Sequence, residues 1–364
     1  MKKQEKIFVI GHKNPDTDSI CSAIAYCDIK NRTTQDSKYI AKRAGQINEE
    51  TEYVLNRFGV QPPGYLSNIG TQVKDMDIRL SPEANKSMSL KNAWDLMQEN
   101  SIVSLPIREK DGTLEGLITI GDIAKTYMDT TDSYLLSRAR TQYQRIAETI
   151  GGKVVEGNGH GYFVQGKIMV ATANPDKMKE YVEENDMIIM GNREEDHLQA
   201  IEQNVSCIIV GLGIEVTEKV LKLAHEKDII IISSPYDTFT ISRLINQSIP
   251  VKYIMKTENL VTFKTEDFTD DIQDVMIKHR HRAFPVIDKK GKCIGTISRR
   301  NFLDMHRKKV VLVDHNEKDQ AVDNIDKAEI MEIIDHHRLG TVETIAPVFF
   351  RNQPVGCTAT IVYQ

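Results

Sequence analysis

Three stretches of the chain are largely hydrophobic, and each ends in polar residues. They cover residues 6–12, 310–314 and 329–335 and are rich in Val and Ile. A run with few alternating polar positions is typical of a strand that is buried on both faces of a parallel sheet. Ligands of such sheets bind beyond the carboxyl ends of the strands. The pattern therefore predicts a parallel α/β sheet with its chemistry at one edge. The roughly 300 residues between the first two stretches indicate a large insertion.

The insertion contains two similar segments, offset by a constant 179 residues. Each is predicted to form a helix, a strand, a glycine turn, a second strand and another helix. A unit of about 55 residues is too small to cover both faces of its own sheet, so we expect the two copies to pack together. The matched positions are Met97 and Met276, Pro106 and Pro285, Gly112 and Gly291, Gly116 and Gly295, and Thr119 and Ser298.

Between the repeats, residues 130–249 alternate strand-like runs with helical stretches, which indicates a third α/β unit. The segment Gly211-Leu212-Gly213 lacks the third glycine of a dinucleotide-binding fingerprint, so we interpret it as a turn. The sequence pattern reveals no catalytic constellation in this unit. Strands are expected near residues 153–155, 186–190, 207–210 and 228–232, and a helix at 217–225.

Composition narrows the classes of function. The chain has 364 residues, enough for two or three domains, and its formal net charge of −5 argues against a surface built to bind nucleic acid. No apolar run is long enough to cross a membrane or to form the core of a signal peptide. The five cysteines are odd in number and show no paired spacing. We therefore expect a cytoplasmic protein that binds neither nucleic acid nor membranes.

The polar residues at the three strand ends are of the kinds that bind metal ions. An aspartate before a helix is also common as an N-cap, and for the first loop alone that interpretation is equally good. Pooled at one sheet edge, however, the carboxylates would repel one another, and divalent cations resolve that conflict. Mixed carboxylate and imidazole ligands favour Mn²⁺, Co²⁺, Fe²⁺ or Zn²⁺, whereas Mg²⁺ prefers oxygen and water. The predicted dinuclear centre draws on His12, Asp16, Asp18, Asp314, Asp335, His336 and His337.

Residues 11–20, 313–317 and 335–340 resemble the motifs of the DHH phosphoesterase superfamily. Asn14-Pro15 before the first aspartate and the Asp-His-Asn-Glu run narrow the resemblance to the family II, manganese-dependent inorganic pyrophosphatases. The two repeats resemble CBS domains, and the unit between them resembles a DRTGG domain. The resemblance implies an α/β fold in which a DHH-type parallel-sheet domain is interrupted by a regulatory region, a CBS pair flanking a DRTGG-like α/β domain. The implied boundaries are 1–68 and 308–364 for the DHH domain, 69–129 and 250–307 for the CBS repeats, and 130–249 for the DRTGG-like domain.

The same resemblance implies a role for each strand-end residue. The reaction would be hydrolysis of pyrophosphate to two orthophosphates by a water activated between two Mn²⁺ or Co²⁺ ions, with Mg²⁺ accompanying the substrate. His337 would act as a catalytic residue that contacts a phosphate, and Asp335 would orient the neighbouring imidazole. The implied ligands are His12, Asp16 and Asp314 for one ion, and Asp18, Asp314 and His336 for the other.

CBS pairs commonly bind adenine nucleotides, and the resemblance therefore implies AMP, ADP or ATP as a regulator. A Ser or Thr and an Asp three residues later would reach the ribose, although the second repeat has an uncharged Asn in place of the Asp. Two arginines of a basic run could contact the phosphates, but such a run is also typical of a solvated face. Pairing of CBS repeats between subunits would give a homodimer. The implied nucleotide-binding residues are Thr119, Asp122, Ser298, Asn301, Arg280 and Arg282.

The sequence stops inside a pattern typical of a helix that begins near Gly356. In the family, a further domain supplies another aspartate ligand and the lysines and arginines that hold pyrophosphate. After residue 335 this chain has only Glu343 as an acid, and Arg338 and Arg351 as cations. We therefore expect a C-terminally truncated chain that binds metal but hydrolyses pyrophosphate poorly by itself.

Two other functions remain open from the sequence. The chain could be another DHH phosphoesterase, acting on oligonucleotides, cyclic dinucleotides or polyphosphate, although the acidic net charge and Asn14-Pro15 argue against it. It could also be a non-catalytic nucleotide sensor. The complete set of strand-end aspartates and histidines argues against that alternative.

Overall fold

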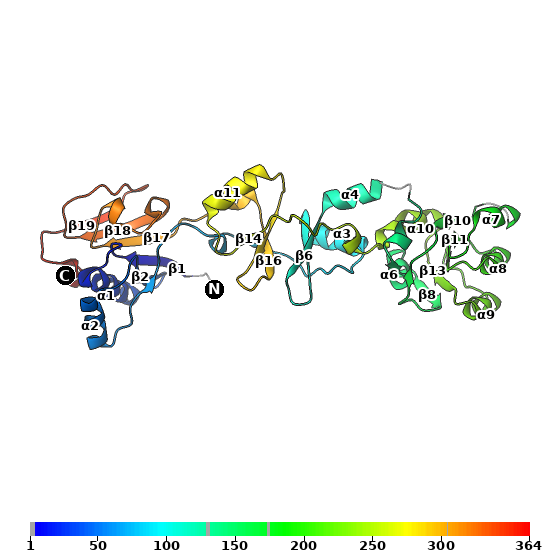
Figure 1. The fold of residues 1–364 in the computed structure, drawn as a ribbon, viewed down its shortest axis with the longest axis horizontal. Helices are drawn as coiled ribbons and strands as arrows, with labels where there is room; N and C mark the ends of the chain where they lie inside the picture. The colour runs from blue at the N-terminus through cyan, green and yellow to red at the C-terminus, as the bar shows by residue number, and fades with distance from the viewer. Residues whose placement is uncertain (1–3, 129–131, 173–174, 304) are drawn as a thin grey trace. The chain divides into compact units, whose positions relative to one another are not determined.

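The computed structural model describes residues 4–128, 132–172, 175–303 and 305–364. The chain divides into two units, whose elements are labelled in Figure 1. The first unit comprises Met1–Ile78, Phe263–His281 and Ser298–Gln364, and the second comprises Arg79–Thr262 and Arg282–Ile297. Each unit has hydrophobic clusters of its own.

The first unit is built on a six-stranded sheet with the order β19-β18-β17-β1-β2-β3. Every neighbouring pair is parallel, which confirms the predicted parallel sheet. The predicted strands are β1, β17 and β18. The hydrophobic pattern does not predict the other three, because they are short or carry several polar residues. The bounds are β1 (Glu5–Ile10), β2 (Ser37–Arg43), β3 (Gly64–Tyr65), β17 (Lys309–Val313), β18 (Glu329–Asp335) and β19 (Phe349–Asn352).

Both faces of this sheet are covered, which explains why its central strands read as continuous hydrophobic runs. Val311 and Val313 of β17 belong to one cluster with Cys27 of helix α1 (Thr17–Thr33). Val310 and Leu312 belong to a second cluster on the opposite face. The first unit also contains β14 (Phe263–Lys264) and the helices α2 (Glu49–Phe58), α11 (Thr269–Lys278) and α12 (Thr358–Tyr363).

The second unit contains a five-stranded sheet with the order β10-β11-β12-β13-β8, which confirms the α/β character expected between the repeats. Strands β10 to β13 are parallel, and β8 runs antiparallel to β13. The strands are β8 (Lys153–Glu156), β10 (Ile168–Val170), β11 (Met187–Met190), β12 (Cys207–Val210) and β13 (Ile230–Ser233), and β7 (Thr141–Gln142) pairs with β9 (Tyr162–Phe163). The helices are α5 (Leu135–Arg138), α6 (Tyr143–Thr149), α7 (Pro175–Tyr181), α8 (Glu194–Glu202), α9 (Glu218–Glu226) and α10 (Thr238–Leu244).

The two repeats share one hairpin geometry. The register shifts after Ile107 in the first hairpin and after Val286 in the second, and these residues are equivalent in the repeat. Both turns contain a glycine with positive φ, Gly112 and Gly291. The hairpins are β5 (Ser104–Arg108) with β6 (Leu114–Thr119), and β15 (Phe284–Ile287) with β16 (Cys293–Ile297), which also pairs with β4 (Arg79–Leu80).

The hairpins of the two copies contact each other, and the helix that follows the hairpin differs between the copies. The N–H of Cys293 donates to the carbonyl of Gly112 at 3.0 Å. In the first copy the hairpin lies between the helices α3 (Leu90–Glu99) and α4 (Ile120–Met128). In the second copy the final helix is only a 3₁₀ turn, Arg299–Phe302, so the expected full helix is wrong at this position.

Candidate metal centre and nucleotide cavity

The loop after β1 places its first aspartate at the start of a helix. Asp16 Oδ1 accepts the N–H of Ser19 at 2.9 Å, so Asp16 is the N-cap of α1, as the simpler interpretation of the sequence expects. The same oxygen lies 3.8 Å from His12 Nε2. Because 59% of the Asp16 side chain is exposed, capping leaves the carboxylate accessible to other partners.

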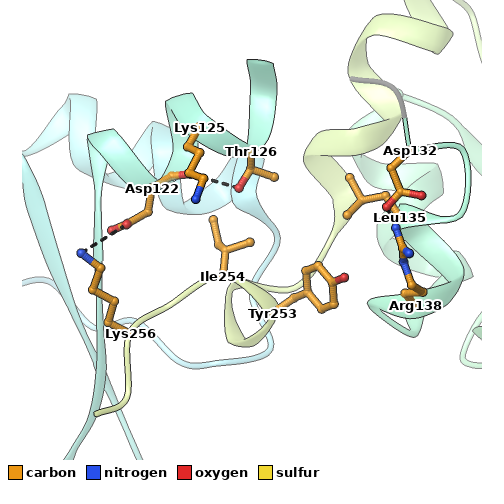
Figure 2. A pocket seen from close by; sticks show the side chains of 9 residues that line it. All are labelled: Asp122, Lys125, Thr126, Asp132, Leu135, Arg138, Tyr253, Ile254 and Lys256. Carbon is orange, nitrogen blue, oxygen red and sulfur yellow. Dashed lines mark hydrogen bonds and ion pairs between the residues drawn. The ribbon is translucent and has the colours of Figure 1, made fainter. Parts of the chain in front are cut away.

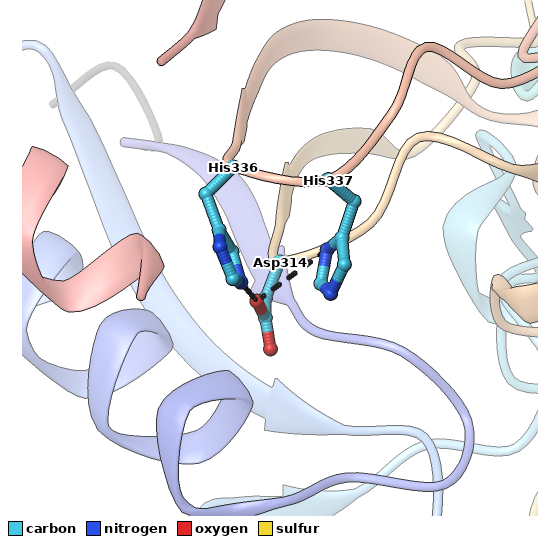
Figure 3. A group of neighbouring side chains, drawn as sticks. All are labelled: Asp314, His336 and His337. Atoms are coloured by element: carbon cyan, nitrogen blue, oxygen red, sulfur yellow. Dashed lines mark ion pairs between the residues drawn. The ribbon is translucent and has the colours of Figure 1, made fainter. Parts of the chain in front are cut away.

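Asp314, which directly follows β17, is the centre of the cluster (Figure 3). Its side chain is 1% exposed, and its backbone has a left-handed φ of 63°, a conformation that Asp adopts more readily than most residues. His336 Nε2 lies 3.4 Å from Asp314 Oδ1, and His337 Nδ1 lies 3.9 Å from the same oxygen. On the other side, His12 Nε2 lies 3.4 Å from Asp314 Oδ2. Three strand ends therefore meet at one buried carboxylate.

The buried carboxylate of Asp314 lacks a full set of partners. Oδ1 accepts the hydroxyl of Thr358 at 3.0 Å, but Oδ2 has no hydrogen bond among the described residues. Burial raises the pKa of Asp314, and the neighbouring His12 only partly opposes that shift. For His12, burial lowers the pKa, but the neighbouring carboxylates of Asp314, Asp16 and Asp18 together outweigh it and the net shift is upward. A buried acceptor without a donor is costly, and a cation would supply the missing partner.

Asp18 lies beside this cluster and also holds a second helix. Its Oδ2 lies 3.8 Å from His336 Nε2 and accepts the N–H of Thr358 at 2.6 Å. Its Oδ1 accepts the N–H of Ala359 at 2.8 Å and the hydroxyl of Ser22 at 3.1 Å. Asp18 therefore caps the N-terminus of α12 from α1.

Hydrogen bonds fix the ring orientations of the two adjacent histidines. His336 Nδ1 lies 3.0 Å from the carbonyl of Val355, which can only accept, so Nδ1 carries the proton. In the neutral ring, Nε2 then presents its lone pair towards Asp314. His337 Nδ1 bonds Asp335 Oδ1 at 2.8 Å, which leaves its Nε2 free to meet another group.

Asp335 is fully buried and engaged on both oxygens. Its Oδ1 also accepts the backbone N–H groups of His336 at 2.8 Å and His337 at 3.2 Å, and its Oδ2 accepts the side-chain amide of Asn316. Burial alone would raise the pKa of Asp335, but the hydrogen bonds from His337 and Asn316 outweigh it and lower the pKa. Asp335 therefore orients the His337 ring.

Sequence reasoning missed three residues of the cluster. Asn316 bonds Asp335 and the carbonyl of Arg338, and its place in the Asp-His-Asn-Glu run was an available signal. His315 is buried with Nδ1 bonded to a backbone carbonyl, and burial lowers its pKa to about 4. Its ring stands edge-on to that of His12, with centroids 6.5 Å apart. No sequence signal marks Thr358, which reaches Asp314 only through the tertiary fold.

The donor atoms of this cluster suit divalent transition-metal ions. Among the residues that the structure describes, two groups have ligand atoms that all lie within 4.8 Å of one another, and both contain Asp314. A carboxylate shared between two such groups is the arrangement that holds two ions together. The groups are His12 with Asp16 and Asp314, and Asp314 with His336 and His337.

A cavity of about 590 Å³ lies in the second unit, next to the first CBS-like repeat (Figure 2). Asp122 Oδ2 accepts the Thr119 N–H at 2.9 Å and the Thr119 hydroxyl at 2.6 Å. Asp122 Oδ1 lies 3.6 Å from Lys256 Nζ. The cavity is lined by Asp122, Lys125, Thr126, Asp132, Leu135, Arg138, Tyr253, Ile254 and Lys256.

Of the predicted nucleotide ligands, Asp122 is among the residues that line this cavity, and Thr119, Ser298, Asn301, Arg280 and Arg282 are not. Ser298 and Asn301 form the same kind of turn as Thr119 and Asp122, with Asn301 Oδ1 accepting the Ser298 hydroxyl at 2.9 Å. Asn301 Nδ2 donates to the carbonyl of Asp77 at 2.6 Å. Arg280 and Arg282 are exposed. The lysines and the arginine that line the cavity were not predicted from the sequence.

Known protein families match the inserted region, and known proteins match nearly the whole chain. A DRTGG domain matches residues 145–248, and CBS domains match 78–129 and 251–308. The chain is 39% identical over 360 residues to a cobalt-dependent inorganic pyrophosphatase of Clostridium perfringens, covering 99% of this chain and 65% of that protein. It is 34% identical over 364 residues to a probable manganese-dependent inorganic pyrophosphatase of Thermotoga maritima, covering 100% of this chain and 66% of that protein.

A solved structure of a relative's regulatory region resembles the inserted region. It is that of the CBS and DRTGG domains of the regulatory region of the Clostridium perfringens pyrophosphatase, complexed with its activator, diadenosine tetraphosphate. The TM-score is 0.59 at 33% identity, and the match covers 63% of this chain and 100% of that chain.

The fold and the cluster define an α/β protein with a candidate metal centre at the carboxyl edge of a parallel sheet and an inserted CBS and DRTGG region. By sequence, the chain belongs to the family II inorganic pyrophosphatases that carry such a regulatory region. It spans about two thirds of the length of these relatives, 65% and 66%. Within the described residues, none of the helices has both the length and the apolar character needed to span a membrane.

Proposed function

We propose that the chain takes part in the hydrolysis of inorganic pyrophosphate to two orthophosphates with two divalent ions, Mn²⁺ or Co²⁺, and Mg²⁺ with the substrate. The observation that carries the proposal is the buried Asp314 carboxylate, whose unpartnered Oδ2 faces His12 while Oδ1 faces His336. We assign His12, Asp16 and Asp314 to one ion, and Asp18, Asp314 and His336 to the other. Bound there, the ions would lower the pKa of a water molecule and neutralise phosphoryl oxygens.

The protein groups around the ions have separate tasks. His336 keeps its proton on Nδ1 through the Val355 carbonyl, so Nε2 stays a ligand atom. Asp335 holds His337 by a 2.8 Å bond to Nδ1. The free Nε2 of His337, whose side chain is 51% exposed, is then available to contact a phosphate oxygen of the substrate.

We further propose that an adenine nucleotide (AMP, ADP or ATP) regulates the chain at the cavity beside Thr119 and Asp122. The support is Asp122, which lines the cavity and accepts the Thr119 hydroxyl, and the resemblance to a regulatory region complexed with diadenosine tetraphosphate. The roles of Ser298, Asn301, Arg280 and Arg282 in nucleotide binding are part of the same proposal.

A homodimer through the CBS repeats is supported by an apolar face. Helix α4 has no buried residue, and Tyr127 and Met128 on it are 42% and 78% exposed. Trp94 of α3 is 38% exposed, and Trp94 and Tyr127 line an apolar groove of about 340 Å³. We also propose a cytoplasmic location, which the five free cysteines support, and the domain boundaries given by the sequence.

The test separates metal binding from turnover. His336→Gln removes one proposed ligand, and His306→Gln, an exposed histidine, is the matched control. We expect His336→Gln to weaken Mn²⁺ binding, measured by calorimetry, at least about tenfold, and His306→Gln to leave it unchanged. Equal affinities in all three proteins would refute the metal site. Phosphate release from pyrophosphate by the wild-type chain with Mn²⁺ then tests the expectation that these residues alone turn over slowly.

A substrate panel distinguishes the alternatives. Release of products from an oligonucleotide, a cyclic dinucleotide or polyphosphate in preference to pyrophosphate would favour another DHH phosphoesterase. Nucleotide binding without any turnover or Mn²⁺ binding would favour the sensor.

A further inference from the structure

The cavity of the second unit has polar groups at two ends and an apolar stretch between them. In Figure 2, Tyr253 and Ile254 lie between the two charged ends. One end holds a carboxylate with two lysines, and the other holds a carboxylate with an arginine. The first end consists of Asp122, Lys125 and Lys256, and the second of Asp132 and Arg138.

The first end suits a ribose and its phosphates. Asp122 Oδ2 is occupied by Thr119, so Oδ1 is the oxygen that is open to ribose hydroxyls. Lys256 Nζ lies 3.6 Å from that oxygen. The Lys256 backbone is paired with Leu117 by two 2.9 Å hydrogen bonds, so only its side chain is free to move towards a phosphate. Lys125 also lines this end of the cavity and adds a second positive charge.

The apolar stretch then suits the base. A phosphate chain would be poorly solvated along Ile254 and Leu135, whereas a purine ring buries well against aliphatic and aromatic side chains. With the ribose at Asp122 and the ring along Tyr253, the far edge of the purine would point towards the second charged end, which lies beyond Tyr253 and Ile254 (Figure 2).

The second end presents an acceptor that is held in place. Arg138 forms an ion pair with Asp132 Oδ2, and the N–H of Tyr134 donates to Asp132 Oδ1 at 3.0 Å. The Asp132 side chain is 28% exposed, so its remaining lone pairs stay accessible from the cavity. A carboxylate accepts hydrogen bonds and repels carbonyl oxygens.

We propose that Asp132, positioned by Arg138, reads the six-position of the purine and selects adenine over hypoxanthine and guanine. The exocyclic amine of adenine donates to the carboxylate, whereas the six-oxo group of the other two bases faces it with a second acceptor. This inference rests on the proposed nucleotide site and adds the residue that sets its base specificity.

The experiment compares AMP with IMP, which differ at this edge of the base, by calorimetry on the 364-residue chain. We expect the wild-type protein to bind AMP at least about tenfold more tightly than IMP, as one charge-assisted hydrogen bond implies. Asp132→Asn, which can donate to the six-oxo group, should reduce that ratio at least about fivefold. Asp228→Asn, an exposed aspartate of the same unit, is the matched control and should keep the ratio.

The possible failures are distinguishable. If neither nucleotide binds to the wild-type chain at millimolar concentration, the proposed nucleotide site itself is refuted. If AMP binds but IMP binds equally well, or if Asp132→Asn keeps the wild-type ratio, only the base-reading role of Asp132 is refuted. Arg138→Gln provides a second variant: it should reduce the AMP-to-IMP ratio while retaining AMP binding, and an unchanged ratio would contradict the positioning role of Arg138.

Discussion

Replacing Asp314 by Asn should have opposite effects on stability with and without metal. Without metal, the Asp314→Asn variant should be at least as stable as the wild type. With Mn²⁺, it should be less stable than the wild type. The substitution keeps the size of the side chain and removes its charge. The carboxylate is 1% exposed, and its Oδ2 has no hydrogen bond among the described residues. Without metal the wild-type chain therefore carries a buried charged oxygen that accepts no hydrogen bond and has only the His12 imidazole, 3.4 Å away, to offset its charge, whereas the side chain of the variant is neutral.

The size of each effect follows from this environment. A buried, unsatisfied polar group costs about 1–3 kcal/mol, so the metal-free variant should be as stable as the wild type or more stable by about 1 kcal/mol. With Mn²⁺ at about 100 times its dissociation constant, binding to the folded state adds about 2.7 kcal/mol to the wild type. The variant should gain little, because it lacks the carboxylate that faces both His12 and His336.

The assay needs a probe of the first unit. The single tryptophan, Trp94, lies in the second unit, so its fluorescence reports unfolding of that unit and serves as an internal control. Amide hydrogen exchange of peptides that cover β17 and β18 reports local stability at the cluster. Exposed Asp319→Asn is the matched control and should follow the wild type under both conditions.

Two results would refute this reasoning. If Mn²⁺ protects β17 equally in the wild type and in Asp314→Asn, the carboxylate does not bind the ion. If the metal-free variant exchanges much faster than the metal-free wild type, the charge of Asp314 is already well compensated by the protein.

Two further predictions concern the loop after β18 and a surface pair. A Cβ at Gly340 would lie 2.8 Å from the carbonyl oxygen of Asn316. Gly340→Ala should therefore lower the free energy of unfolding of the first unit, measured in urea, by about 1–3 kcal/mol. Gly356→Ala is the control and should leave it unchanged, because a Cβ there would meet no atom within 4 Å. The pKa of His225 is raised because Glu156 accepts its hydrogen bond. The stability that this pair contributes is therefore fully present below the pKa of the unfolded state, about 6.5, and is lost as the pH rises through the pKa of the folded state. In an NMR titration, Glu156→Gln should move the His225 pKa back down, and an unchanged midpoint would show that Glu156 is not the cause.

The sequence predicted the parts of the fold that are buried on all sides. Runs such as residues 310–313 carry no polar position because both sheet faces are covered, and that signal is local. The strand β2, Ser37–Arg43, has three consecutive apolar residues, Tyr39 to Ala41, between polar ones, and Tyr39 and Ala41 pack in a core cluster, so its pattern is weak. The edge strand β19 begins with two exposed phenylalanines and could not be distinguished from a loop.

What the sequence determined by itself was the chemical kind of each group and its place at a strand end, since those depend on residue identity and on short-range periodicity. Only the tertiary structure decided which atoms meet. The pairing of β1, β17 and β18 brings His12, Asp314 and His336 together across about 300 residues of chain, and Thr358 joins them without any local signal. The same holds for the cavity, where Lys256 faces Asp122 because its backbone pairs with β6. Long-range pairing sets these distances, and no window of neighbouring residues encodes it.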